Sequence, residues 1–537
     1  MNKRGPMLFT SYSFIGFITI VFLLYYLLPK KCQWPLLLVA SYVFYFFASP
    51  SYLIFIGATT VSAYLVSRKL DSLQTEQEAY LKAKKGELSR EEKKAYKAAI
   101  KAKKWKWLLL CLFFNLGILA VLKYTNFMIA NINGILSAFH SDGHLSFVNL
   151  VLPMGISFYT FQTMGYIIDV YRGTSKAEKN PFKLALFVSF FPQLVQGPIS
   201  RFNDLSQSLF EQHKFDTKVV GYGLYRITWG YFKKAVIADR ILTAVNAIIH
   251  DPETYQGGFV FVGMLFYALE LYADFTGGID ITIGIAQTMG IKVTENFQRP
   301  YLSKNIKEYW KRWHITMGTW FTDYIFYPIS VCKPMLKLSK FSRSKFGEAI
   351  GKRVPVYLSS FAVWFTTGIW HGASWNFIVW GLMNFVVIMI SQELEPLYGK
   401  FHSRFHVKDK KWYGAFEIIR TILLMSCLRM FDCYRDVPLT FKMFGNMFTN
   451  FNLADLNAEA FLGLGLTAAD YALLFICFLI LLTVSLVQEK KGSVRDLIFA
   501  RPAWCKYVVF GILVLAVLIF GAYGIGYDQS QFIYNQF

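Results

Sequence analysis

Two histidines in tryptophan-rich segments are the residues of this chain best suited to chemistry. His314 ends the run Trp310-Lys311-Arg312-Trp313-His314, and His371 lies in the run Trp370-His371-Gly372-Ala373. Only 8 histidines occur among 537 residues. These two lie inside or beside long apolar runs, where a titratable side chain is costly and usually has a function. An imidazole held there can move a proton or activate a hydroxyl.

The composition predicts a membrane protein built from helices. Hydrophobic residues make up 55% of the chain, charged residues only 17%, and the mean hydropathy is +0.36. Many apolar runs approach or exceed the ~20 residues that cross a bilayer. They are continuous, whereas the strands of a barrel alternate in short segments. The net charge of +22 gathers between the apolar runs, as in cytoplasmic loops, and therefore does not indicate nucleic acid.

Several kinds of site are not indicated. The 7 cysteines are scattered and form no C-x-x-C pair, so neither a zinc site nor a disulfide framework is expected. No H-E-x-x-H, phosphate-binding G-x-x-x-x-G-K-[ST] or G-x-S-x-G motif occurs. Residues 8–28 are apolar without a clear cleavage site, which predicts a retained span.

The distribution of charge predicts the organisation of the chain. Residues 68–106 contain 13 Lys or Arg and 6 Asp or Glu with almost no apolar face, which predicts a solvated cytoplasmic helical hairpin. Residues 126–144 are mixed and expected outside, and 182–198 are too broken for a simple span and predict a re-entrant segment. We expect four parts: N-terminal spans at 1–67, the charged hairpin at 68–106, a core at 107–431 and C-terminal helices at 432–537.

The same charge pattern places His371 deep in the bilayer. Basic segments at 333–353 and 400–411 flank two apolar runs, 355–370 and 375–391, and His371 lies in the turn between these runs. About 16 residues at ~1.5 Å per residue reach roughly 24 Å from the inner face, past the midplane. Continuing this count puts the C-terminus outside.

Acidic residues precede the first histidine. Glu270 and Asp274 are four residues apart and share one helix face, and Asp280 follows Gly277-Gly278. Buried carboxylates need partners, and Arg299 and Arg312 are the expected ones. Two functions remain open for these acids, a salt-bridged scaffold or direct catalysis, and the scaffold is favoured.

Several motifs together resemble a known family. The segments 271–291 and 296–330, followed by GIWHGASWNFIVWG at 368–381, closely resemble the membrane-bound O-acyltransferases. Within that family they are similar to the bacterial alginate and peptidoglycan O-acetyltransferase branch. MGISFYTFQTMGYIIDVYRG at 154–173 and FPQLVQGPISRF at 191–202 are similar to the same branch.

The resemblance implies a fold and a set of roles. The fold would be all-α, a ring of roughly 11 transmembrane helices with re-entrant segments around a central tunnel. The invariant histidine of the family falls on His371, which would act as general base, and a second polar position falls on His314, which would orient the hydroxyl or bind the donor. Seven other residues are expected to support the tunnel or the donor site: Arg312, Trp313, Trp370, Asp274, Glu270, Asn296 and Arg299. Among these, Arg312 would polarise the acyl carbonyl.

The end of the chain adds a further expectation. Its last residues, FIYNQF, resemble the terminal motif of the same branch and of the small tail protein in teichoic-acid D-alanylation. Tyr534 would then accept the acyl group outside the membrane and pass it on. The alternative is that the tail is an interfacial aromatic anchor.

The implied activity is O-acetylation of an extracytoplasmic polysaccharide by a multi-pass protein of a bacterial plasma membrane. The donor would be acetyl-CoA, or alternatively an acyl carrier protein, with no bound cofactor and no metal. The partners would be the lipid bilayer, an extracytoplasmic SGNH-type acetyltransferase and the polysaccharide acceptor. Two alternatives remain open, D-alanyl transfer to teichoic acid and a polysaccharide or lipid transporter.

Overall fold

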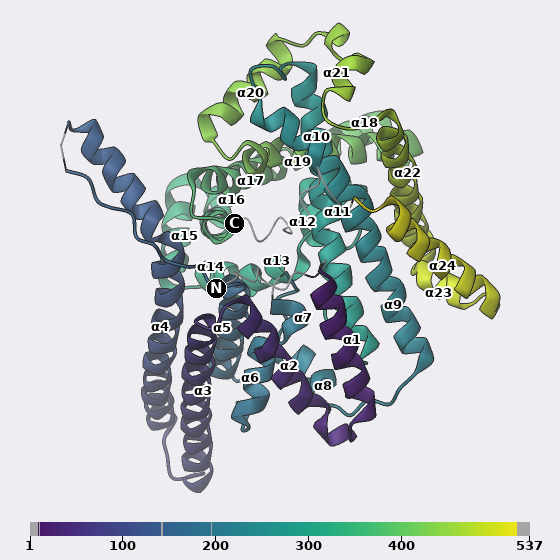
Figure 1. The fold of residues 1–537 in the computed structure, drawn as a ribbon. Helices are drawn as coiled ribbons and strands as arrows, with labels where there is room; N and C mark the ends of the chain where they lie inside the picture. The colour runs from purple at the N-terminus through teal and green to yellow at the C-terminus, as the bar shows by residue number, and fades with distance from the viewer. Residues whose placement is uncertain (1–8, 10, 141–142, 195, 523–537) are drawn as a thin grey trace. The chain divides into compact units, whose positions relative to one another are not determined.

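The computed structural model describes residues 9, 11–140, 143–194 and 196–522, and its regular structure in these ranges is helical apart from one isolated bridge (Figure 1). The expected all-α class is therefore confirmed. The chain divides into two compact units, one of Met1–Gly221 with Ile285–Thr294 and one of Tyr222–Gly284 with Glu295–Phe537.

The first unit is built from eight helices around an aromatic core. The rings of Phe14 and Phe191 each lie 5.9 Å from the ring of Phe44, so three distant segments meet there. The helices are α1 (Tyr12–Leu27), α2 (Gln33–Ala48), α3 (Tyr52–Ala83), α4 (Arg90–Ala138), α5 (Ile156–Arg172), α6 (Pro181–Ser189), α7 (Phe191–Leu194) and α8 (Phe202–Leu209).

The charged segment at 68–106 is a helical hairpin, as the sequence predicts. It consists of the ends of α3 and α4, joined by a turn at 84–89. Ser89 and Glu92 form a reciprocal capping box at the start of α4, and the rings of Tyr80 and Tyr96 stack at 4.1 Å. Local capping and cross-hairpin stacking thus order a segment that has almost no apolar face.

Helix α4 is longer than expected. It runs for 49 residues to Ala138 and includes most of the segment predicted to be mixed and external. Asn126 and Asn133 on this helix bind the backbone of Val148 and Leu145. These bonds join residues 12 to 22 positions apart. The composition of the segment alone therefore did not show that the asparagines have partners that keep them in the helix.

The segment at 182–198 is broken into the short helices α6 and α7, as predicted. Gln193 in α7 donates hydrogen bonds to the Ser200 hydroxyl at 2.5 Å and to the Pro198 carbonyl at 3.1 Å. These bonds satisfy polar groups of a buried irregular backbone, which apolar surroundings require.

The second unit contains the two tryptophan-rich segments. Two of its helices, α9 and α11, extend slightly beyond it. The helices are α9 (Thr217–Tyr231), the π-helical η2 (Phe232–Ala238), α10 (Asp239–His250), α11 (Gly258–Thr288), α12 (Ile306–Arg312), α13 (Ile315–Phe321), α14 (Tyr327–Ser330), α15 (Lys333–Phe346), α16 (Glu348–His371), α17 (Trp375–Glu393), α18 (Glu395–Phe405), α19 (Lys411–Tyr434), α20 (Val437–Thr449), α21 (Ala458–Leu462), α22 (Ala468–Lys491), α23 (Val494–Phe499) and α24 (Ala503–Phe520).

Helix α11 is continuous through a pair of glycines. One helix of 31 residues runs through Gly277-Gly278. A Cβ atom on Gly277 would lie 2.9 Å from the carbonyl oxygen of Gly230 in α9. The glycine therefore permits a close approach of two helices, a common device in membrane proteins.

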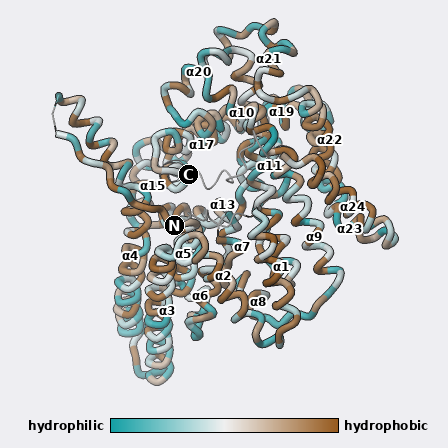
Figure 2. The backbone as a smooth tube through the Cα atoms, in the orientation of Figure 1, coloured by the Kyte–Doolittle hydropathy of each residue, from teal (hydrophilic) through white to brown (hydrophobic). Residues whose placement is uncertain are grey.

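Six of the described helices are long and apolar enough to cross a membrane, namely α3, α4, α11, α17, α22 and α24. Figure 2 shows the apolar character of α22 and α24 along their lengths. Ile512, Leu518 and Ile519 on α24 are 63%, 64% and 66% exposed, as lipid-facing side chains are. The count of roughly 11 spanning helices, the ring and the tunnel remain predictions.

Candidate active site

The structure brings the two histidines into one aromatic cluster of the second unit. The ring of Trp370 lies 6.0 Å from that of His314 and 5.1 Å from that of His371. His314 is fully buried and His371 is 9% exposed. Two segments separated by more than 50 residues thus place their imidazoles near one indole.

The hairpin of α16 and α17 positions His371, the last residue of α16. A Cβ atom on Gly368 would lie 2.6 Å from the carbonyl oxygen of Phe377, and one on Gly381 would lie 2.4 Å from that of Trp364. Only glycine permits this approach of the two backbones. The His371 ring then packs edge-on against Trp380 of α17 at 4.8 Å.

Asn296 fixes the backbone that carries His314. Its side-chain oxygen accepts hydrogen bonds from the backbone N–H of Thr316 at 3.1 Å and from the Thr316 hydroxyl at 2.9 Å. Its carbonyl accepts another from the N–H of Ile315 at 2.9 Å. These bonds hold the first turn of α13, where His314 has a φ of 48° that non-glycine residues seldom adopt.

A cavity of about 410 Å³ reaches His314. Lys307 and Lys311 contribute cationic side chains to its lining, and Trp364 and Thr367 of α16 line it as well. His371 lies four residues after Thr367, so it is one turn further along the same helix face. The cavity therefore combines cationic groups suited to an anionic substrate with access to one of the two imidazoles.

Arg429 is a member of this site that the sequence analysis missed. It lies on α19, is 4% exposed and forms an ion pair with Asp432 at 2.7 Å. Its guanidinium lies 4.9 Å from the ring of Trp380 and 5.1 Å from that of Trp313. Its Nε is a buried donor with no hydrogen-bond partner among the described residues. An Arg and an Asp three positions apart near the end of an apolar run were the available signal.

The arginine affects the protonation of the nearer histidine. His314 lies between α12 and α13, outside the six apolar helices. Burial, and after it the Arg429 charge, lower the pKa of His314 to about 3. The imidazole of His314 is therefore neutral at physiological pH. A neutral imidazole suits the expected role of His314, which is to orient a hydroxyl or bind the donor.

The expected partners of the buried carboxylates were wrong. Arg299 binds Glu489 at 2.5 Å, and Arg312 binds Glu308 at 2.6 Å and Glu489 at 2.9 Å. Arg312 thus already has two carboxylate partners. The nearness of Arg299 and Arg312 to the acids in the sequence was misleading, because α22 supplies Glu489 from a distant part of the chain.

Lysines of η2 neutralise the carboxylates of α11 instead. Lys234 binds Asp274 at 2.6 Å and Asp239 at 2.7 Å. This arrangement is the salt-bridged scaffold that the sequence analysis favoured for Asp274. Glu270, one turn earlier on α11, is 3% exposed, and its Oε2 has no hydrogen-bond partner among the described residues.

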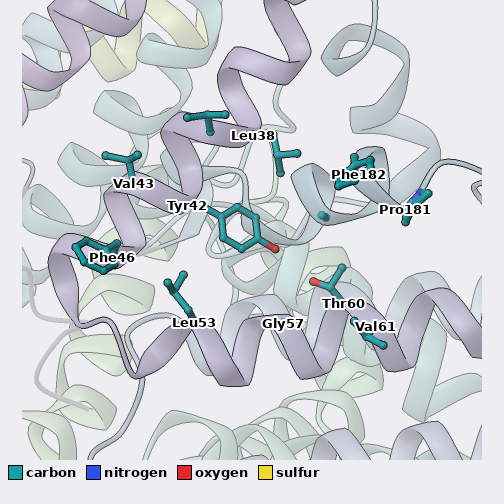
Figure 3. Close-up of a pocket in the computed structure, with 12 residues that line it drawn as sticks. Leu38, Tyr42, Val43, Phe46, Leu53, Gly57, Thr60, Val61, Pro181 and Phe182 are labelled. Atoms are coloured by element: carbon teal, nitrogen blue, oxygen red, sulfur yellow. The ribbon is translucent and has the colours of Figure 1, made fainter.

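Two other features lie apart from this cluster. The tail that contains Tyr534 is outside the described residues. The first unit has a cavity of about 650 Å³ whose lining includes Tyr42, Phe46 and Phe182 but no Lys, Arg, His, Asp or Glu (Figure 3). Such a lining is apolar apart from a few hydroxyl groups and carries no ionised side chain.

Comparisons with known proteins identify the family. The family model described as "MBOAT, membrane-bound O-acyltransferase family" matches residues 177–433, a range that contains His314, His371 and Arg429. The probable alginate O-acetylase AlgI of Pseudomonas putida is 30% identical over 477 residues, which cover 88% of this chain and 87% of the relative. The chain belongs to the membrane-bound O-acyltransferase family. It is therefore an acyltransferase with several membrane-spanning helices.

Other relatives in this family are named for different activities. The peptidoglycan O-acetyltransferase of Helicobacter pylori is 30% identical over 430 residues, or 74% of this chain and 72% of the relative. The teichoic acid D-alanyltransferase of Bacillus subtilis is 30% identical over 291 residues, or 52% of this chain and 69% of the relative. The match to the D-alanyltransferase thus covers less of this membrane-bound O-acyltransferase than the matches to the two O-acetylating relatives do.

Proposed function

We propose that this acyltransferase moves an acetyl group from a cytoplasmic thioester across the plasma membrane for O-acetylation of an extracytoplasmic polysaccharide. The observation that carries the proposal is the pair of buried histidines whose rings both lie near that of Trp370. The relatives whose names specify O-acetylation of alginate or peptidoglycan match 74–90% of the chain, which favours acetyl as the acyl group.

In the proposed reaction His371 is the general base. It takes the proton of the acceptor hydroxyl while the oxygen attacks the thioester carbonyl, the carbon–sulfur bond breaks and the thiolate leaves. His314, neutral because it is buried, orients the hydroxyl or binds the donor. The aromatic rings around both imidazoles exclude water that would otherwise hydrolyse the thioester.

Arg429 replaces Arg312 as the group that stabilises the developing oxyanion. Arg312 has its guanidinium on Glu308 and Glu489, whereas Arg429 retains a buried Nε donor beside Trp380. A buried donor of this kind is worth most where water is excluded. Trp380 contacts both Arg429 and His371, which supports a shared reaction centre.

The donor in this proposal is acetyl-CoA, whose phosphates suit Lys307 and Lys311 in the lining of the cavity. An acyl carrier protein is the alternative donor. The acetyl group then passes to Tyr534, to an SGNH-type partner and to the polysaccharide, a route that rests on the resemblance of the FIYNQF tail. In the alternative, the tail is an interfacial anchor and the acceptor is reached directly.

D-alanyl transfer to teichoic acid is the second candidate function. The relatives named teichoic acid D-alanyltransferase support it, but they match only 44–52% of the chain. The transporter alternative loses its basis because the chain belongs to an acyltransferase family.

The test is transfer from labelled acetyl-CoA in membranes that contain the wild type, His371→Ala or His250→Ala, followed by mass spectrometry of the C-terminal peptide. His250 is an exposed residue at the end of α10 and serves as the control. We expect label on Tyr534 in the wild type and in His250→Ala, and none in His371→Ala. Full transfer by His371→Ala contradicts the mechanism. Transfer of D-alanine but not acetyl supports the second candidate.

A further inference from the structure

The second unit contains a cavity that the proposed reaction does not use. Its volume is about 720 Å³, within the range of ligand-binding pockets. Residues of α9, η2, α11, α22, α23 and α24 and of the segment 295–299 line it. The lining shares no residue with that of the cavity at His314. This cavity is therefore a candidate site for a second ligand.

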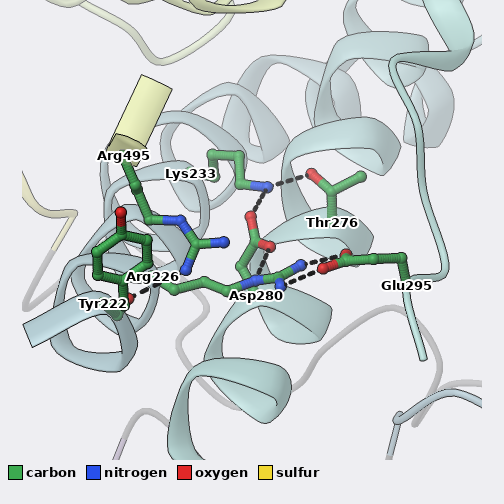
Figure 4. Close-up of polar contacts among 7 residues, drawn as sticks. All are labelled: Tyr222, Arg226, Lys233, Thr276, Asp280, Glu295 and Arg495. Carbon is green, nitrogen blue, oxygen red and sulfur yellow. Dashed lines mark hydrogen bonds and ion pairs between the residues drawn. The ribbon is translucent and has the colours of Figure 1, made fainter. Parts of the chain in front are cut away.

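One end of this cavity is a network of ion pairs (Figure 4). Asp280 accepts hydrogen bonds from Arg226 Nε at 2.8 Å and from Lys233 Nζ at 2.6 Å. Glu295 accepts two from the terminal nitrogens of Arg226 at 2.5 Å each, and Lys233 also donates to Thr276 at 2.7 Å. The two cations and two carboxylates of this network neutralise one another.

Two further arginines make the polar end cationic. Arg495 and Arg299 belong to the lining, which then has four cationic side chains against the carboxylates of Asp280 and Glu295. Arg299 pairs with Glu489, which lies outside the lining, and Arg495 is the second added cation. Arg495 is half-buried and donates to the carbonyl of Tyr222 at 3.1 Å, and Figure 4 shows it beside Arg226.

The position of Arg495 in this field favours an anion. Burial, and after it the charge of Arg226, lower the pKa of the Arg495 guanidinium. The carboxylates of Asp280, Glu295 and Asp496 offset part of this repulsion. A bound phosphate would accept charge-assisted hydrogen bonds from the neighbouring guanidinium groups of Arg226 and Arg495.

The other end of the cavity is apolar and is formed by two candidate membrane spans. The apolar residues of α22 and α24 that line it are Ile480, Leu481, Val484, Val509, Ile512, Leu513 and Ala516, and α22 also contributes Ser485 and Gln488. Within the most apolar 18-residue stretch of each helix, 17% of the residues are buried in α22 and 0% in α24. Other faces of these helices are therefore available to lipid, and the cavity joins a cationic end to a lipid-like wall.

We propose that this cavity binds an anionic phospholipid, with the phosphate at Arg495 and an acyl chain along α22 and α24. A basic pocket between spanning helices is a recognised way to bind lipid head groups. Lys490 and Lys491 at the end of α22, Arg501 in the connection to α24 and Lys506 in the first turn of α24 form a basic segment of the kind that marks the cytoplasmic side. The bound lipid therefore comes from the inner leaflet.

Lipid suits the cavity better than a free nucleotide does. A nucleoside phosphate such as the donor coenzyme has no hydrocarbon chain to cover the side chains of α22 and α24. The phospholipid covers them and removes apolar surface from water at roughly 25 cal/mol per Å². This site is separate from the acyl-transfer site proposed above.

Native mass spectrometry of the full-length protein in a neutral detergent tests the site. The probes are phosphatidylglycerol, phosphatidylcholine with the same acyl chains, and coenzyme A. We expect the wild type to retain one phosphatidylglycerol in preference to phosphatidylcholine. We expect Arg495→Gln to lower the fraction with bound phosphatidylglycerol at least fivefold. Arg501→Gln, in the same basic connection but outside the lining, is the matched control and should leave that fraction unchanged.

A second pair of variants tests the apolar end without changing charge. Ala516→Trp fills the cavity, whereas Leu518→Trp on the same helix changes a side chain that is 64% exposed. We expect only the first variant to lose the lipid. Equal retention of both lipids, or equal losses in each variant and its control, overturns the proposal. Coenzyme A that binds through Arg495 while phosphatidylglycerol does not bind also overturns it.

Discussion

At the scale of residues, the reaction centre depends on side chains that do not react. Trp370 contacts both histidines, and Trp380 contacts His371 and Arg429. Large rigid rings fix the positions of the polar groups between them and exclude water. The polar groups that remain must then be satisfied by specific partners, since an unpaired buried group costs free energy.

Asn296 is such a partner, and its removal should displace His314. Asn296→Leu leaves the Thr316 N–H and hydroxyl without their acceptor, at about 1–3 kcal/mol for each donor. We expect a lower unfolding temperature and at least a tenfold slower acyl transfer.

Asn384→Leu is the matched control for this variant. Asn384 is equally buried, but its amide donates only to the carbonyl of Trp380 in its own helix. It should leave transfer nearly unchanged. An Asn296→Leu enzyme as fast as the control contradicts the positioning of His314 by Asn296.

Arg429 and Asp432 allow stability to be separated from catalysis. Arg429→Gln leaves the buried Asp432 carboxylate unpaired, which should lower the free energy of unfolding by about 3–5 kcal/mol. If Arg429 stabilises the oxyanion, transfer should fall about 100-fold or more.

The double variant Arg429→Gln/Asp432→Asn removes the unpaired charge. We expect its thermal stability to recover while its transfer rate stays low. Recovery of both quantities in the double variant would show that Arg429 has only a structural role.

At the scale of elements, glycines decide how closely the helices approach. Gly368 and Gly381 bring α16 and α17 together at His371, and Gly230 and Gly277 bring α9 and α11 together. The second contact places the lysines of η2 beside the carboxylates of α11. The two glycine pairs thus position both the aromatic cluster and the buried ion pairs.

Gly381→Ala should separate α16 from α17, because its Cβ would lie 2.4 Å from the carbonyl oxygen of Trp364. Overpacking of this kind costs about 1–3 kcal/mol, so we expect a lower unfolding temperature and slower transfer.

Gly399→Ala provides the control for this prediction. No atom lies within 4 Å of a Cβ on Gly399 in α18, so alanine should stabilise the helix by about 0.5–1 kcal/mol. Thermal unfolding followed by the transfer assay compares the two variants. Equal behaviour of the two contradicts the close contact at Gly381.

At the scale of the whole molecule, the direction of transfer depends on topology. The charge count puts the turn at 84–89 inside and residues 436–466 outside. A membrane-impermeant maleimide should therefore label Asn457→Cys in intact cells and Gly86→Cys only after permeabilisation.

This experiment uses a background in which the accessible natural cysteines are replaced. Labelling of both positions from the same side of the membrane contradicts the predicted topology. It would also leave the proposed passage of the acetyl group across the membrane without its geometric basis.

Much of the protein followed from the sequence alone. Apolar runs of sufficient length specified a helical membrane protein, because a backbone in lipid must satisfy its own hydrogen bonds. Charged segments between the runs specified the hairpin of α3 and α4. Rare histidines in tryptophan-rich, apolar surroundings drew attention to His314 and His371 because an idle titratable group is costly there.

Only the tertiary structure decided which groups meet. Asp274 pairs with Lys234 of η2, Arg312 pairs with Glu489 of α22 as well as with Glu308 of its own helix, and Arg429 joins the histidines from α19. The cavity at Arg495 likewise needs α22 and α24 to pack against α9 and α11. Ion pairs and cavities form between helices, and their partners depend on helix contacts that local periodicity and composition do not encode.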